Sequence, residues 1–122
     1  RVAGAAWRGL GPVVGVTVSR RAEECVERVA TIARSAADLA GVSAPDTPPT
    51  VVDGHIGPGY GMRSPDGDAA AKLVARTEGV FLDPIFAAKA MAGLLAAIRR
   101  GEVAGPVVFL VTGGAPTLFT TR

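Results

Sequence analysis

The residues best suited to chemistry in this 122-residue chain are a threonine beside two glycines, and a lysine in an alanine-rich segment. Thr112-Gly113-Gly114 follows an apolar run, and its backbone N–H groups can turn toward an anion. The same three residues equally suit a tight strand-to-helix turn that merely needs glycine. Lys89 is one of two lysines in the chain, against eleven arginines. It is either the reactive amine of an enzyme or part of the scaffold.

A glycine-rich loop supplies the other candidate groups. The stretch "GHIGPGYGMRSPDG" (Gly54–Gly67) has five glycines and two prolines, which excludes a helix or a central strand. Loops of this kind carry function more often than the elements they connect. Tyr60 lies in its middle. His55 is the only histidine, and because no Cys, Asp or Glu cluster stands near it at ligand spacing, no metal site is expected.

Short β-branched runs predict the strands that position these groups. Residues 12–19, 50–53 and 106–112 each combine valine-rich sequence with flanking glycine or proline, which is typical of short buried strands. Helical segments alternate with them, so we expect an α/β fold with a parallel sheet. Ligands bind beyond the carboxyl ends of the strands in such sheets, and this places Thr112 at the first position to inspect.

Three amphipathic helices are expected over Ser19–Gly41, Ser64–Gly79 and Asp83–Gly101. Serine or aspartate stands at the cap position of each, proline follows the cap in the second and third, and glycine ends all three. Asp83 is therefore most simply a helix cap. The residues expected to face the core are Cys25, Val29, Ile32, Ala33, Ala36 and Ala40 in the first helix, Ala70, Leu73, Val74 and Thr77 in the second, and Met91, Leu94, Leu95 and Ile98 in the third.

Composition limits the class of protein. Hydrophobic residues make up 48% and aromatic residues 5%, so an aliphatic core of one α/β domain is expected. The net charge is +2 with scattered arginines, which gives no support to nucleic-acid binding, and no apolar run approaches the length of a membrane span. The single Cys25 excludes an internal disulfide and fits the cytoplasm, as a buried structural thiol. No signal peptide is recognisable, and the chain, starting at Arg1, reads as if it begins inside a larger protein.

Several motifs together resemble a known enzyme family. The stretches "GHIGPGYG", "LVARTEGVFLDPIFAAKAMAGL" and "VVFLVTGGAPTLF", preceded by "VVGVTVSRRAEECVERV", occur in this order. They resemble the carboxyl-terminal portion of the D-cysteine desulfhydrase and 1-aminocyclopropane-1-carboxylate deaminase family. These are pyridoxal-phosphate enzymes of the tryptophan-synthase-β-like fold, fold type II. The resemblance implies a three-layer parallel sheet with helices on both faces, with residues 1–122 forming the carboxyl-terminal part of the cofactor-binding large domain.

The resemblance also implies roles for individual residues. Thr112 matches the residue whose hydroxyl faces the pyridine nitrogen of the cofactor, and Gly113 follows it. Phe86 matches a tyrosine that stacks on the cofactor ring, although without the resemblance a phenylalanine at this position is more often a core residue. Ala87 matches a glutamate in the deaminases and a threonine in the desulfhydrases. Tyr60 matches a tyrosine near the substrate and is the expected catalytic residue, able to hydrogen-bond the substrate or assist proton transfer.

Other parts of the family site have no counterpart in the chain. The Schiff-base lysine, the nucleophilic serine region and the glycine-rich phosphate cup belong to the amino-terminal half in this family, and neither Lys72 nor Lys89 stands in the Schiff-base context. Lys89 matches a lysine that many members carry without using it for that bond. The implied partners are therefore a complementary amino-terminal half, a small amino-acid substrate and a second subunit in a dimer.

Two departures from the family pattern bear on the reaction. Phe86 lacks the tyrosine hydroxyl and Ala87 lacks the glutamate, which argues against opening of the cyclopropane ring. A lyase or deaminase of the D-cysteine desulfhydrase type, with β-elimination, is favoured over ring opening, although the tyrosine-threonine pair usual in the desulfhydrases is missing here too. The alternatives are a catalytically degenerate subunit with a binding or regulatory role, and a stand-alone doubly wound domain that binds a small anion at Thr112–Gly114.

Overall fold

Two parallel strands lie at the centre of the computed structural model, which describes residues 12–119. Strand β1 (Val14–Val16) pairs with β2 (Thr50–Val52), with Val14 opposite Thr50. The pairing continues one residue further, where the N–H of Thr17 donates to the carbonyl of Val52 at 2.9 Å. The strands predicted near 12–19 and 50–53 and their parallel direction are confirmed, although β1 is shorter than its β-branched run. The opening stretch of the sequence lies outside the described residues.

The cap of the helix between these strands lies two residues later in the chain than predicted. Helix α2 spans Ala22–Ala40, and its cap is Arg21, not Ser19. A hydroxyl on the preceding strand end organises the turn instead: the Oγ1 of Thr17 accepts the N–H of Arg20 at 3.2 Å and lies 2.8 Å from the Arg20 carbonyl oxygen. Because Thr17 is buried, this turn is anchored to the sheet and leaves Ser19 out of the helix start.

Only a narrow strip of α2 is buried. Ala33 and Ala37 are its buried residues, and Gly41 ends the helix in the left-handed conformation with φ 64°, as predicted. The prediction of a wider buried stripe on this helix is wrong, because the two short strands present little surface for α2 to cover. Ile32 is 63% exposed. Of the other residues expected in the stripe, Val29, Ala36 and Ala40 are exposed and Cys25 is half-buried.

Helices α3 (Pro65–Glu78) and α4 (Ala87–Arg99) pack against each other. The predicted start of α3 is confirmed: the Oγ of Ser64 accepts the N–H of Gly67 at 3.2 Å, and proline occupies the first turn. Gly67 and Ala70 are buried in α3. Small residues here allow close approach to α4, and this moves the larger Leu73 and Thr77 of the expected stripe to the exposed side.

Helix α4 lies directly on β1 through a glycine. A Cβ atom built on Gly93 would lie 2.8 Å from the Cγ1 of Val16, so any larger residue would push the helix off the strand. The buried face of α4 consists mostly of small residues, whereas Ile98, expected in the core, is 46% exposed. The fully buried positions of the helix include a charged one, Lys89, with no exposed surface.

The segment after α4 is extended but forms no strand. The predicted strand over 106–112 is wrong for the described residues, because a strand requires a hydrogen-bonded neighbour and the sheet described within 12–119 holds only β1 and β2. Val108 and Leu110 are 92% and 77% exposed. Phe109 points the other way and packs against the buried cluster of Leu82, Ala87 and Ala88. The segment leads into the short 3₁₀ helix η1 (Ala115–Phe119).

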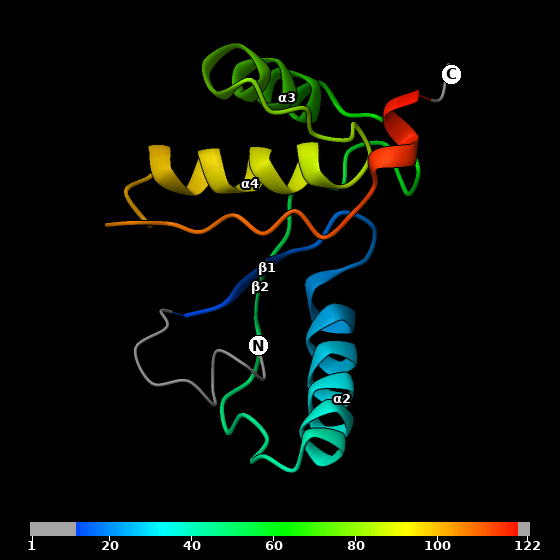
Figure 1. Ribbon diagram of the computed structural model, residues 1–122, viewed down its shortest axis with the longest axis vertical. Coiled ribbons are helices and arrows are strands. Elements are labelled where there is room, and N and C mark those ends of the chain that lie inside the picture. The colour runs from blue at the N-terminus through cyan, green and yellow to red at the C-terminus, as the bar shows by residue number, and fades with distance from the viewer. Residues whose placement is uncertain (1–11, 120–122) are drawn as a thin grey trace.

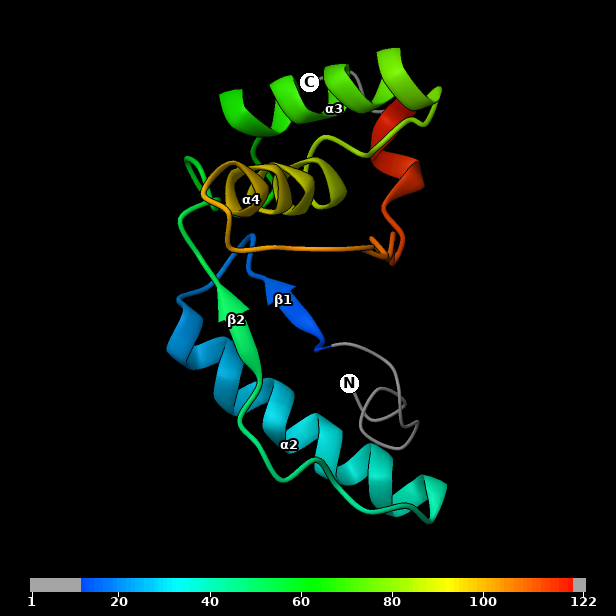
Figure 2. The same cartoon turned by 90° about the vertical axis from the view of Figure 1, so that its left-hand side faces the viewer.

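These elements are stacked in layers (Figure 1). Helix α4 covers one side of the strand pair and α2 the other, with α3 on the outer side of α4 (Figure 2). In both views the extended segment that follows α4 runs along the side of α4 that faces the strands. The α/β arrangement with parallel strands and helices on both faces is the predicted fold class. Among the described helices, none combines the length and hydropathy needed to span a membrane.

Candidate functional site

A cleft opens at the carboxyl end of β1, where the start of α4 and the extended segment meet. Its volume is about 310 Å³. This is the position at which parallel α/β sheets bind ligands. All four residues to which the family resemblance gives a cofactor role line it, and they come from two separate parts of the chain. The lining residues are Val16, Val18, Phe86, Ala87, Ala90, Phe109, Leu110, Thr112, Gly113 and Gly114.

A buried carboxylate positions the first wall of the cleft. Asp83 is 3% exposed, and its oxygens accept the N–H groups of Phe86 at 2.7 Å and Ala87 at 2.8 Å. A third N–H, from Ile85, lies 3.1 Å away. The predicted cap role of Asp83 is confirmed only in part: its carboxylate accepts N–H groups where the helix begins, but the cap residue itself is Phe86, not Asp83. Helix α4 begins only at Ala87, three residues after Pro84, because residues 84–86 first turn around the carboxylate.

The second wall is a glycine turn that contacts the same carboxylate. Gly113 and Gly114 have φ of 132° and 98°, which disfavour any other residue. A Cβ atom on Gly114 would lie 2.6 Å from the Oδ2 of Asp83. The Thr117 hydroxyl lies 2.8 Å from the Gly114 carbonyl oxygen and 3.3 Å from the Oδ1 of Asp83. The turn therefore has a conformational reason for its glycines, and the adjacent carboxylate disfavours an anion bound at Gly114.

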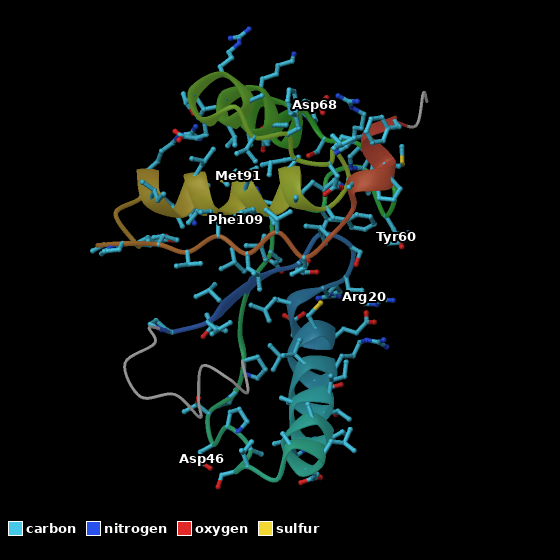
Figure 3. All side chains as sticks on the ribbon, viewed as in Figure 1. Arg20, Asp46, Tyr60, Asp68, Met91 and Phe109 are labelled. Atoms are coloured by element: carbon cyan, nitrogen blue, oxygen red, sulfur yellow. The ribbon has the colours of Figure 1, made fainter. Side chains whose placement is uncertain are left out.

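Tyr60 approaches the cleft from the glycine-rich loop without lining it. Its ring centroid lies 6.0 Å from that of Phe86, with the rings tilted by 56°. This distance is typical of a tilted aromatic pair. Tyr60 remains 70% exposed. Figure 3 shows Tyr60 beside the η1 end of the molecule, and Phe109 between the extended segment and α4.

Lys89 is not among the residues that line the cleft. Its Nζ donates to the carbonyl oxygen of Ile56 at 2.6 Å and to that of Gly59 at 3.1 Å, both in the loop that carries Tyr60. Removal from water lowers the pKa of the Lys89 ammonium below its ordinary value. Residue patterns did not indicate this pairing, because backbone carbonyls leave no trace in a sequence. The only available signal was a lysine at a helix position that the alanine pattern assigns to the core.

Comparisons with known proteins identify the family of the chain. The sequence model of the family "Pyridoxal-phosphate dependent enzyme" matches residues 4–113. A D-cysteine desulfhydrase of Yersinia pestis (strain Pestoides F) is 46% identical over 109 residues, which cover 88% of this chain and 33% of the relative. The D-cysteine desulfhydrase of Klebsiella pneumoniae (strain 342) is 40% identical over the same length and coverage.

A solved structure shares the fold. It is described as an ACC deaminase homologue, superposes with a TM-score of 0.65 at 31% sequence identity, and is matched over 75% of this chain and 27% of its own. The present chain thus spans about a third of the length of the curated relatives it matches. The resemblance to the desulfhydrase and deaminase family is confirmed by both kinds of relative. This chain belongs to the pyridoxal-phosphate-dependent enzyme family.

Proposed function

We propose that this chain forms the ring-binding side of the pyridoxal-phosphate site of a lyase or deaminase that acts on a small amino acid. The observation that carries the proposal is the cleft at the end of β1. It brings Phe86 and Ala87, from the start of α4, together with Thr112 and Gly113, from the extended segment. The D-cysteine desulfhydrases among the relatives favour β-elimination as the reaction.

The side chains that line the cleft fit a substituted pyridine ring. Phe86 supplies a flat apolar face, and Ala87 leaves space beside it. The hydroxyl of Thr112 is a neutral group that can meet a ring nitrogen without forcing its protonation, unlike a carboxylate. When bound, pyridoxal phosphate withdraws electrons from the α carbon of an amino acid. A neutral partner at the nitrogen tempers that withdrawal, which suits loss of a substituent from the β carbon.

Tyr60 is proposed as the residue that meets the substrate. The residue is 70% exposed, and its ring pairs with that of Phe86, which lines the cleft. In that position a phenol can donate a hydrogen bond to a substrate carboxylate or hold a proton for transfer. Opening of a cyclopropane ring is not proposed, because Phe86 and Ala87 offer no hydroxyl or carboxylate and the Ala87 N–H already donates to Asp83.

The Schiff-base lysine and the phosphate-binding site are proposed to come from a complementary amino-terminal half. Lys89 is fully buried and donates to two carbonyls of the loop, so its amine does not reach the cleft. Lys72 lies exposed on α3, which packs on α4. The relatives are about three times as long as this chain, which leaves ample sequence for the missing parts. A dimeric assembly is part of the same proposal.

The proposal is tested by supplying the missing half. The chain is co-expressed with the preceding two thirds of the Yersinia desulfhydrase, and the purified assembly is assayed for bound cofactor by visible absorbance and for pyruvate release from D-cysteine. We expect both, with Thr112→Asp reducing turnover and Lys72→Met leaving it unchanged. An assembly that forms and binds cofactor identically when Thr112 and Phe86 are both replaced by alanine would refute the placement of the ring.

A catalytically degenerate subunit is the second candidate, favoured by the loss of both polar groups at Phe86 and Ala87. It predicts an assembly that binds cofactor but releases neither pyruvate nor ammonia from D-cysteine, L-cysteine or 1-aminocyclopropane-1-carboxylate. Restoring Phe86→Tyr together with Ala87→Thr distinguishes the candidates, because a degenerate desulfhydrase site should regain turnover with this pair. Release of pyruvate by the unmodified assembly excludes this second reading.

A further inference from the structure

The side chain of Lys89 is buried without a carboxylate partner. Every ion pair found among residues 12–119 is made by an arginine. Lys89 has no exposed surface. A buried amine is tolerated only where its N–H groups find acceptors. The acceptors here are the carbonyl oxygens of Ile56 and Gly59, at 2.6 and 3.1 Å. A lysine retained in this way needs a reason, because a leucine or methionine would fill the same core space without a desolvation penalty.

The route of the side chain shows which segments it joins. Its stem passes the first turn of α3, where a Cβ atom on Gly67 would lie 3.3 Å from the Cγ of Lys89. Its amine then ends in the loop on both sides of Gly57-Pro58. Lys89 therefore connects the interior of α4 to a loop segment that has few ties of its own. Within that segment, the backbone bond from the N–H of Met62 to the Gly59 carbonyl is long, at 3.4 Å.

The start of α4 makes a second contact with the loop. Phe86 is the cap residue of α4, and Lys89 lies in the first turn of the helix. Phe86 meets the ring of Tyr60, and Lys89 meets the carbonyl of Gly59, the residue directly before Tyr60. The two contacts therefore hold Gly59 and Tyr60, which are neighbours in the loop, from the start of α4. Neither contact alone would define the direction of a tyrosine that is 70% exposed.

We propose that Lys89 is a positioning residue for Tyr60: its amine fixes the turn over 56–59 and thereby holds the tyrosine ring against Phe86 at the rim of the cleft. The amine keeps at least two N–H groups whether or not it carries a proton, so both carbonyls stay bound in either state. The consequence for turnover rests on the proposed function, whereas the tether itself does not.

Chymotryptic cleavage after Tyr60 measures the tether directly. The bond after Tyr60 is cut when the loop leaves α4, and mass spectrometry separates this cut from cuts at other aromatic residues. Lys89→Met keeps the stem and removes both donors. We expect it to accelerate cleavage after Tyr60 about tenfold or more, the change expected for a charge-assisted hydrogen bond. Lys72→Met, at the chain's other lysine, should leave the rate unchanged.

Two results would overturn the tether. One is a folded Lys89→Met protein cut after Tyr60 at the wild-type rate. The other is an equal acceleration at every chymotryptic site, which would make Lys89 a support of the whole core. If Lys89→Met does not fold, Lys89→Gln replaces it, because its shorter amide cannot reach both carbonyls; the same criteria then apply to that variant.

A double-mutant cycle connects the tether to the reaction. If Lys89 acts through Tyr60, the turnover of Tyr60→Phe carrying Lys89→Met should equal that of Tyr60→Phe alone, since the lysine then has nothing left to position. Additive losses in kcat would refute action through Tyr60. Absence of any turnover by the wild-type assembly would instead refute the proposed function, and the cleavage rates would still decide the tether.

Discussion

Replacing Gly114 with alanine should damage the cleft through the carboxylate of Asp83. The new Cβ would lie 2.6 Å from both the Oδ2 and the Cγ of that side chain, a distance that real Cβ atoms do not adopt. Asp83 must then move, and its bonds to the N–H groups of Phe86 and Ala87 weaken. Loss of a capping carboxylate costs about 1–2 kcal/mol of stability. The backbone adds its own penalty of about 1–3 kcal/mol, because φ is 98°.

A second glycine separates these two effects. Gly105 has φ 87°, close to that of Gly114, but a Cβ atom on Gly105 meets nothing within 4 Å. Gly105→Ala therefore carries the strain without the collision. In urea unfolding followed by circular dichroism, we expect Gly114→Ala to lose about 1–2 kcal/mol more of the free energy of unfolding than Gly105→Ala. Equal losses in the two variants would show that the contact with Asp83 has no energetic role, and the account of a shared carboxylate would fail.

Three further predictions concern other contacts of the same elements. Gly93→Ala should lose about 1–3 kcal/mol of the free energy of unfolding, because its methyl group would lie 2.8 Å from Val16 and force α4 away from β1; an unchanged urea midpoint would contradict this close packing. Asp83→Asn should weaken the α4 cap, whereas Asp66→Asn, on the exposed first turn of α3, should have a smaller effect in the same assay; the reverse order would be inconsistent with the hydrogen bonds of Asp83. The stability of the protein should rise with pH between the lowered pKa of Lys89 and its ordinary value, since the unfolded chain there binds more protons than the folded one. Urea unfolding at a series of alkaline pH values checks this, and Lys89→Met should show a smaller rise; identical pH slopes in the two proteins would remove the basis for the lowered pKa.

Local chemistry allowed much of the fold to be predicted. The start of α3 depends on Ser64 and the residues next to it, and the ends of α2 and α3 depend on Gly41 and Gly79, which adopt φ of 64° and 68°. Such signals act within one turn of the chain and do not depend on the remaining protein. The paired strands could also be predicted, because short β-branched runs flanked by turn residues are typical of strands.

Contacts between distant segments could not be predicted in the same way. The run over 106–112 has the composition of a strand. A strand also needs a neighbouring strand to which it is hydrogen-bonded, and the run has no such neighbour within residues 12–119. The predicted core faces of α2 and α4 were too wide. Periodicity assigns large apolar residues such as Ile32 and Ile98 to the core, and both are exposed. The observed contacts are made by alanine and glycine, which let backbones approach.

The cleft illustrates how both kinds of information combine. Asp83 was predicted as a cap from its place before proline; its carboxylate does accept N–H groups at the start of α4, although the cap residue is Phe86. Its second contact, with the turn at Gly114, depends on a segment thirty residues later and on a φ that only glycine tolerates. The one carboxylate therefore sets the position of Phe86 on one wall and of Gly114 on the other. If a ring is bound between those walls, its fit depends on Asp83 although that side chain never touches it, and substitutions at Asp83 should change cofactor affinity as well as the stability of α4.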